Sequence, residues 1–251
     1  MSFNDKLIDQ LKNGKKGKGY SEEVKAFALT LNFYSAAAYR YLRKKFDMHL
    51  PAPSTIRNWY SNVDCSPGIC KQSLDYLKDK ANEAANKNEK VYVSLMFDEM
   101  AIRQQIQWDC SSKRFEGVVN YGIDIIDKDC TIPATNAIVF LVNAVNGFWK
   151  VPVAYYFVTT LNASEKAAVL INILSAIQST GVETISVTFD GARSNLSMIN
   201  VLGGQITSSN NIKTDFPHPI SKNPVFVFLD VAHMLKLIRN ILGISIHILL
   251  F

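Results

Sequence analysis

The chain has 251 residues, of which 48% are hydrophobic and 20% are charged, a composition typical of a soluble globular protein with one large domain or two small ones. No stretch reaches the roughly 18 uninterrupted apolar residues of a membrane span, and the first residues lack the apolar core of a secretory signal. The four cysteines are spread out without a zinc-finger spacing, which favours reduced thiols over a structural zinc site.

The net charge of +5 is distributed unevenly. Residues 1–90 contain 16 Lys and Arg against 10 Asp and Glu, whereas residues 91–251 contain 11 against 12. A basic N-terminal part followed by a near-neutral remainder indicates that the N-terminal part binds a polyanion. The alternative is that basic runs such as Lys12–Lys18 are solvated linker, and the charge alone leaves both interpretations open.

Residues 1–19 are predicted to form a flexible basic linker. A short amphipathic stretch, Phe3–Leu11, precedes three glycines placed among lysines in Asn13–Gly19. Leu7 and Leu11 could end a dimerising coiled coil, but two turns do not establish one, so a homo-oligomer stays an open alternative.

Three short helices are predicted between Ser21 and Tyr60. Ser21 caps the first, the second covers 36–46, and the third covers 54–60 with Ile56 and Trp59 packed inward. Sharp joints and a polar last helix are typical of a helix-turn-helix, although a small all-α module without DNA remains the alternative. The basic excess favours DNA binding. The side chains expected to contact DNA are Thr55, Arg57, Asn58, Arg40, Arg43 and Lys44.

A further amphipathic helix is predicted over 70–87, and the polar run at 86–90 suggests a domain boundary. The hydrophobic period then changes to that of strands. The expected elements are strands at 91–97, 101–108, 117–124, 136–145 and 151–159, a helix at 164–179 capped by Ser164, a strand at 184–189, a helix at 192–202, a polar loop at 208–223, a strand at 225–229 and a helix at 233–242. This order predicts an α/β (α+β) fold, in which an all-α N-terminal region is followed by a mixed sheet with flanking helices.

Three predicted strands end in aspartate: Asp98, Asp190 and Asp230. Ligands of open α/β sheets gather at the carboxyl ends of strands, and carboxylates brought together there repel each other unless a cation lies between them. Mg²⁺ or Mn²⁺ is the expected cation, because these hard ions prefer oxygen ligands and can assist phosphodiester cleavage. The alternative is that each aspartate caps the next helix, and this is the stronger interpretation for Asp230.

A polar stripe follows Asp230, with His233, Lys236 and Arg239 at steps of three residues along the last helix. The stripe could face a ligand, or it could be the basic exposed face of a capped helix. The sequence contains no glycine-rich phosphate loop and no hydrolase serine elbow.

Several ordered segments together resemble the P element-type transposases and their relatives, the transposase-like THAP-domain proteins. The matching segments are Tyr20–Leu31, Ala38–Arg43, Leu50–Trp59, Asp98–Met100, Val153–Phe157, Phe189–Ala192 and Asp230–Asn240. The resemblance implies an RNase H-like core in which Asp98 and Asp190 are the first two acids of a DDE-type site, with metal-assisted DNA cleavage and strand transfer. It also implies that Lys236 contacts a phosphate and Asp230 a nearby polar group of GTP, in an inserted nucleotide-binding domain.

The resemblance divides the chain into a linker (1–19), a helix-turn-helix DNA-binding region (20–88), an incomplete RNase H-like core (89–229) and the start of a GTP-binding insertion (230–251). It also implies a nuclear protein. The family's zinc-binding THAP domain and third catalytic acid, a Glu, have no counterpart here. We therefore expect a transposase fragment that is inactive by itself. The alternatives are a DNA-binding regulator without catalysis and a nucleotide-binding regulator that uses Lys236.

Overall fold

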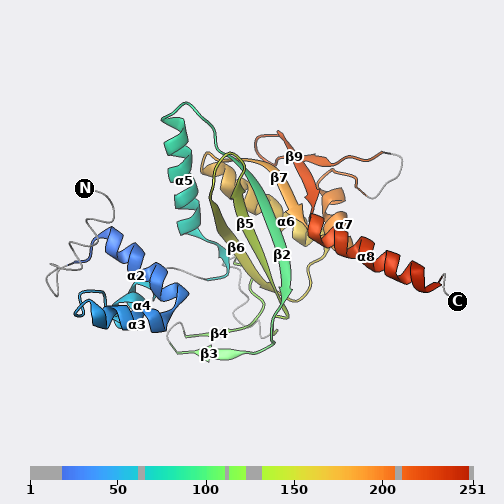
Figure 1. Ribbon diagram of the computed structural model, residues 1–251. Helices are drawn as coiled ribbons and strands as arrows, with labels where there is room; N and C mark the ends of the chain where they lie inside the picture. The colour runs from blue at the N-terminus through green and yellow to red at the C-terminus, as the bar shows by residue number, and fades with distance from the viewer. Residues whose placement is uncertain (1–18, 62–65, 111–112, 123–131, 207–210, 249–251) are drawn as a thin grey trace. The chain divides into compact units, whose positions relative to one another are not determined.

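The computed structural model describes residues 19–61, 66–110, 113–122, 132–206 and 211–248, and the chain forms two compact units, Met1–Asp64 and Cys65–Phe251 (Figure 1). Apart from Gly19, the predicted basic linker lies outside the described residues.

The first unit contains three helices: α2 (Glu22–Tyr34), α3 (Ala36–Lys45) and α4 (Pro53–Ser61). Ser21 Oγ accepts a hydrogen bond from the backbone nitrogen of Val24, and Ser35 Oγ accepts one from that of Ala38. Each serine thus satisfies a first-turn donor that the helix itself cannot pair. The predicted cap at Ser21 is confirmed. The buried core of this unit is formed by Val24, Ala28, Tyr39, Leu50 and Ile56.

The loop between α3 and α4 is held by side chains of α3. The buried Tyr39 hydroxyl donates to the carbonyl oxygen of Pro51 at 2.6 Å, and Arg43 Nε donates to that of Leu50 at 3.0 Å. Burial raises the pKa of Tyr39 to about 12, so the phenol keeps its proton for this bond even in alkaline solution. The direction in which the chain enters α4 is therefore fixed by polar contacts as well as by packing.

The second unit is built on a mixed sheet. Its strands are β1 (Gly68–Ile69), β2 (Tyr92–Ala101), β5 (Asn136–Ala144), β6 (Lys150–Val158), β7 (Glu183–Phe189), β8 (Asp215–Pro217) and β9 (Pro224–Leu229). They lie in the order β1-β6-β5-β2-β7-β9-β8, in which β2, β7 and β9 are mutually parallel and the other pairings are antiparallel. A separate hairpin pairs β3 (Gln107–Asp109) with β4 (Arg114–Glu116).

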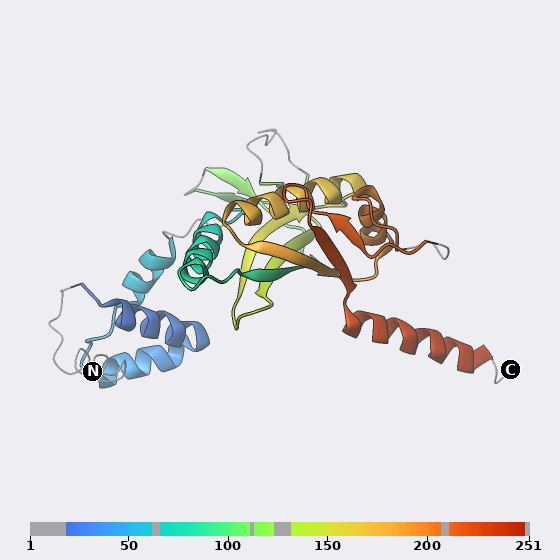
Figure 2. The same ribbon diagram turned by 90° about the horizontal axis from the view of Figure 1, so that it is seen from above.

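Helices cover one face of this sheet (Figures 1 and 2). They are α5 (Lys71–Ala85), α6 (Ala163–Ser179) and α7 (Arg193–Val201), and α8 (Val231–Ile248) follows β9. The largest hydrophobic core lies between the helices and the sheet and includes Leu77 of α5, Leu170 of α6 and Phe97 of β2. Side chains alternate between the two faces along a strand, and Met96, Phe226 and Phe228, which alternate with buried residues, are exposed. Among the described residues, no helix is apolar and long enough to cross a membrane.

Helix α5 belongs to the second unit, and not to the helix-turn-helix region as predicted from the sequence. Ser73 of this helix donates to the carbonyl oxygen of Pro152 on β6 at 2.7 Å, and Leu77 is fully buried in the sheet's core. The clustering of contacts divides the chain after Asp64, well before the polar run at 86–90.

Several element predictions were wrong. Strand β2 does not end before Asp98, because pairing with β5 continues as far as Ala101. Helix α6 begins at Ala163, and its cap is Asn162, which forms a reciprocal capping box with Glu165, so Ser164 is not the cap.

The weak strands expected at 101–108 and 117–124 are reduced to the short β3–β4 hairpin and two isolated bridges, and residues 123–124 lie outside the described part. The supposed polar loop at 208–223 contains β8. This short edge strand forms because Phe216 enters the core and Asp215–Pro217 pairs with β9.

Candidate functional site

Asp98, Asp190 and Asp230 occupy corresponding positions on the neighbouring parallel strands β2, β7 and β9. The last paired residues of β2 and β7 are Met96 and Thr188, and Asp98 and Asp190 each lie two residues further on. In the same way Asp190 and Asp230 each follow the last pair of β7 and β9. Adjacent strands are separated by about 4.8 Å, so the sheet brings Asp98 and Asp190 to one edge as neighbours.

The two phenylalanines that precede these acids support this register. The rings of Phe97 and Phe189 are stacked with centroids 5.1 Å apart, and both are buried on the helix-covered face. Asp98 is exposed and Asp190 half-buried, so both carboxylates can be reached from solvent. The sequence alone suggested strand ends, but only the register makes these two residues neighbours.

Each carboxylate is oriented through one of its oxygens. Asp98 Oδ1 accepts the backbone N–H of Glu99 at 2.8 Å. Asp190 Oδ1 accepts the backbone N–H of Ala192 at 3.2 Å and the side-chain amide of Asn195 at 2.5 Å. Within the described residues neither Oδ2 atom takes part in a hydrogen bond, which leaves one oxygen of each acid available to a cation.

This donor set fits a hard divalent cation such as Mg²⁺ or Mn²⁺, which binds through one or two carboxylates and water. In the part of the chain that the structure describes, no group of three or more His, Cys, Asp or Glu side chains could hold a metal ion. Asp98 and Asp190 thus offer two carboxylates to a cation, and the described residues do not add a third acidic group.

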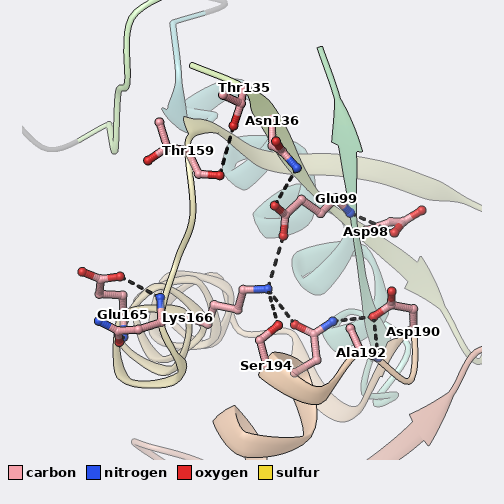
Figure 3. A network of polar contacts seen from close by, with 12 residues as sticks. Asp98, Glu99, Thr135, Asn136, Thr159, Glu165, Lys166, Asp190, Ala192 and Ser194 are labelled. Atoms are coloured by element: carbon pink, nitrogen blue, oxygen red, sulfur yellow. Dashed lines mark hydrogen bonds and ion pairs between the residues drawn. The ribbon is translucent and has the colours of Figure 1, made fainter. Parts of the chain in front are cut away.

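A buried lysine lies beside the two acids (Figure 3). Lys166 of α6 is only 6% exposed, and its Nζ donates to Glu99 Oε2 at 3.2 Å, Ser194 Oγ at 3.1 Å and Asn195 Oδ1 at 3.0 Å. The other oxygen of Glu99, Oε1, accepts the side-chain amide of Asn136 at 2.9 Å. One ammonium group therefore connects β2, α6 and α7 next to both aspartates.

This network was not predicted from the sequence, although the sequence contains one signal of it. The buried stripe of α6 includes Lys166, Leu170, Ile173 and Ile177, so a lysine stands at a position where the helical period requires an apolar residue. A lysine is almost never fully buried unless it is paired, so this position predicts a buried partner.

Asp230 serves as a cap of α8. Its Oδ1 accepts the backbone N–H of Ala232 at 3.1 Å, while its own backbone N–H donates to the carbonyl oxygen of Phe189. Lys236 is exposed six residues further along α8. The capping alternative for Asp230 is thus present in the structure, and the predicted contacts of Asp230 and Lys236 with a nucleotide remain predictions.

The predicted DNA-contacting residues lie on α3 and α4. Ile56 is buried and Trp59 packs on the same core, as predicted, which leaves Arg57 and Asn58 exposed and Thr55 half-buried on α4. On α3, Arg40 and Lys44 are exposed. The guanidinium of the half-buried Arg43 is occupied with the Leu50 carbonyl and with Met48 Sδ, so this residue also holds the loop in place.

Comparison with known proteins gives a consistent set of similarities. Residues 65–203 match the family model described as TNP-like, RNase H N-terminal domain, and residues 2–59 match the one described as Transposable element P transposase-like, HTH domain. The human DNA transposase THAP9 is 31% identical over 232 residues, which are 92% of this chain and 25% of that protein. The Drosophila melanogaster Transposable element P transposase is 28% identical over 239 residues, which are 95% of this chain and 28% of that protein.

Among solved structures, the Drosophila P element transposase strand transfer complex superposes with a TM-score of 0.68 at 26% identity, covering 95% of this chain and 48% of the other. The chain thus spans about a quarter of the length of the curated relatives that it matches. The predicted fold class is confirmed: a helical N-terminal region is followed by an RNase H-like mixed sheet with flanking helices.

Proposed function

Since this chain belongs to the family of P element-type transposases, we propose that its second unit is part of a nuclease core that cuts and joins DNA, with Asp98 and Asp190 as ligands of Mg²⁺ or Mn²⁺. The observation that carries this proposal is the register of β2 and β7, which makes the two carboxylates neighbours with one oxygen of each free of hydrogen bonds to the described residues.

The chemistry follows from where the two acids lie. When bound, a divalent cation activates a water or hydroxyl group and stabilises the leaving oxygen of a phosphodiester. Asp98 and Asp190 would hold it at the edge of the sheet, and the buried phenylalanines behind them keep the strand ends rigid. The described residues provide two carboxylates, and water or residues outside the described part would complete the ligands of the cation.

A titration with Mn²⁺, followed by electron paramagnetic resonance, tests this assignment without depending on cleavage. We expect the Asp98→Asn and Asp190→Asn variants each to weaken Mn²⁺ binding, and Asp215→Asn, which changes an acid on the edge strand β8, to leave it unchanged. Equal Mn²⁺ affinity in all four proteins would refute the metal site.

The first unit is proposed to bind DNA through Thr55, Arg57 and Asn58 of α4 and through the basic residues Arg40, Arg43 and Lys44 of α3. The packing of Ile56 and Trp59 supports this, because it turns the polar side of α4 outward. The nuclear location, the homo-oligomer and the contact of Lys236 with GTP belong to the same proposal. So does the division into linker, DNA-binding region, nuclease core and insertion, with α5 assigned to the nuclease core.

A second candidate is a DNA-binding regulator that does not cleave DNA. The division of the chain into two compact units favours it, since the helical unit has its own core and does not need a complete nuclease site. Gel-shift titrations against salt distinguish the two. For the regulator we expect DNA binding with a steep salt slope that becomes shallower by about one in Arg57→Ala and is unaffected by Asp98→Ala.

Cleavage assays complete the comparison. With two acidic ligands among the described residues, the polypeptide tested by itself is expected to leave DNA intact in Mg²⁺ or Mn²⁺. Cleavage that disappears in Asp98→Ala would refute the expected inactivity and support the nuclease.

A further inference from the structure

We propose that Lys166 is a positioning residue of the metal site, which orients the Asp190 carboxylate through Asn195 and holds the end of β2 through Glu99. The proposal rests on the proposed function of Asp98 and Asp190 as metal ligands. It goes further by assigning a role to a residue that contacts neither the metal nor DNA.

The ammonium group of Lys166 is completely paired. An ammonium has three N–H donors and no acceptor, and Lys166 uses all three on Glu99, Ser194 and Asn195. A lysine at 6% exposure would be strongly destabilising without such partners, so the network compensates the desolvation of its charge.

The orientation of Asn195 follows from this pairing. The oxygen and the nitrogen of a side-chain amide have nearly the same shape, so hydrogen bonds decide which way the group points. Lys166 can only donate, which requires Asn195 Oδ1 to face it. The amide nitrogen must then face Asp190, and it donates to Oδ1 of that carboxylate.

The consequence for Asp190 is that its two oxygens become unequal. Oδ1 accepts from Asn195 and from the backbone of Ala192, and Oδ2 is left for a cation. If Lys166 were replaced by an apolar residue, Asn195 Oδ1 would lose its charged donor, and the amide would hold the Asp190 carboxylate less firmly in the geometry that a metal requires.

The network of Lys166 also reaches Asp98. Glu99 is fixed between Lys166 and Asn136, and its backbone N–H donates to Asp98 Oδ1. Since side chains alternate along a strand, anchoring Glu99 on the helix-covered side turns Asp98 to the other face of the sheet. One buried charge thus orients an acid on each of two neighbouring strands.

The experiment combines Mn²⁺ affinity with an NMR readout of Asn195 in the whole chain. We expect Lys166→Met and Asn195→Ala each to weaken Mn²⁺ binding about tenfold or more, and the double variant to bind no worse than either single variant, because both remove the same link. Leu174→Ala, buried about two turns away on α6, is the matched control: it lowers stability and should leave Mn²⁺ affinity unchanged.

The side-chain amide protons of Asn195 provide the second readout. They should exchange slowly with solvent in the wild-type protein and quickly in Lys166→Met, whereas a merely structural role would move only the melting temperature. If Lys166→Met does not fold, the double variant Lys166→Met/Glu99→Leu, which removes both charges, should lose at least as much Mn²⁺ affinity, because Glu99 also holds the end of β2.

Wild-type Mn²⁺ affinity and slow Asn195 exchange in a folded Lys166→Met protein would overturn the proposal. If the Asp98→Asn and Asp190→Asn variants bind Mn²⁺ like the wild type, it is the proposed metal site that fails. The positioning of Asp190 is then decided by the Asn195 exchange rate alone.

Discussion

Replacing Glu99 by leucine should destabilise the second unit, because it leaves the Lys166 ammonium buried without its counter-charge. At 3.2 Å, and with an effective dielectric constant of about 20, the attraction between the two charges is about 5 kcal/mol. Glu99 is 29% exposed and Lys166 keeps Ser194 and Asn195, so part of this is recovered from water and from neutral hydrogen bonds. We therefore expect a loss of about 2–3 kcal/mol in the free energy of unfolding.

The double variant Glu99→Leu/Lys166→Met makes this prediction specific. Both charges are then absent and the volume is largely kept, so the double variant should be more stable than Glu99→Leu by at least about 1 kcal/mol.

Hydrogen exchange of peptides from α6, measured by mass spectrometry, is the suitable assay, because an optical signal would mix the unfolding of the two compact units. A Glu99→Leu protein with wild-type exchange in α6, or a double variant that is less stable than Glu99→Leu, would refute the reasoning.

Further predictions concern the packing of both units. Gly122→Ala should destabilise the fold by more than about 2 kcal/mol in urea unfolding, because its φ is +63° and a Cβ there would lie 2.3 Å from the Cα of Gly68; wild-type stability would contradict this close approach. Burial lowers the pKa of His218 from 6.5, so the unfolded chain binds a proton first and stability should fall as the pH drops below about 6.5. His218→Asn should reduce this pH dependence, and an unchanged profile would refute the assignment. Tyr39→Phe should destabilise the helical unit by about 1–2 kcal/mol in thermal unfolding, because the carbonyl of Pro51 loses its donor; an unchanged melting temperature would show that water replaces it.

The order of elements could be predicted from the sequence because each strand and helix carries its own period. The strands at 136–144, 150–158 and 183–189 and the helix at 36–45 lie within two residues of their predicted bounds. The predicted ends of an element were wrong where they depend on pairing with another strand. Pairing with β5 extends β2 past Asp98, and pairing with β9 makes Asp215–Pro217 a strand.

The candidate site could be predicted only in part, for a related reason. Aspartates that follow apolar runs are visible in any sequence, so Asp98 and Asp190 were found. The partners of Lys166 lie 67 positions away at Glu99 and 29 positions away at Asn195, and only the fold brings them together. The carboxylates themselves are oriented by groups close in sequence, but the amide of Asn195 is in turn held by the distant Lys166.

The exposed side chains on one face of the sheet affect how this protein can be measured. Phe226 and Phe228 are 48% and 58% exposed, and Met96 lies on the same sheet. Dyes that fluoresce on apolar surfaces are commonly used to detect partly unfolded states, yet here a folded sheet already offers them such a surface. A high initial fluorescence in a dye-based melting curve would then report the native fold rather than its loss.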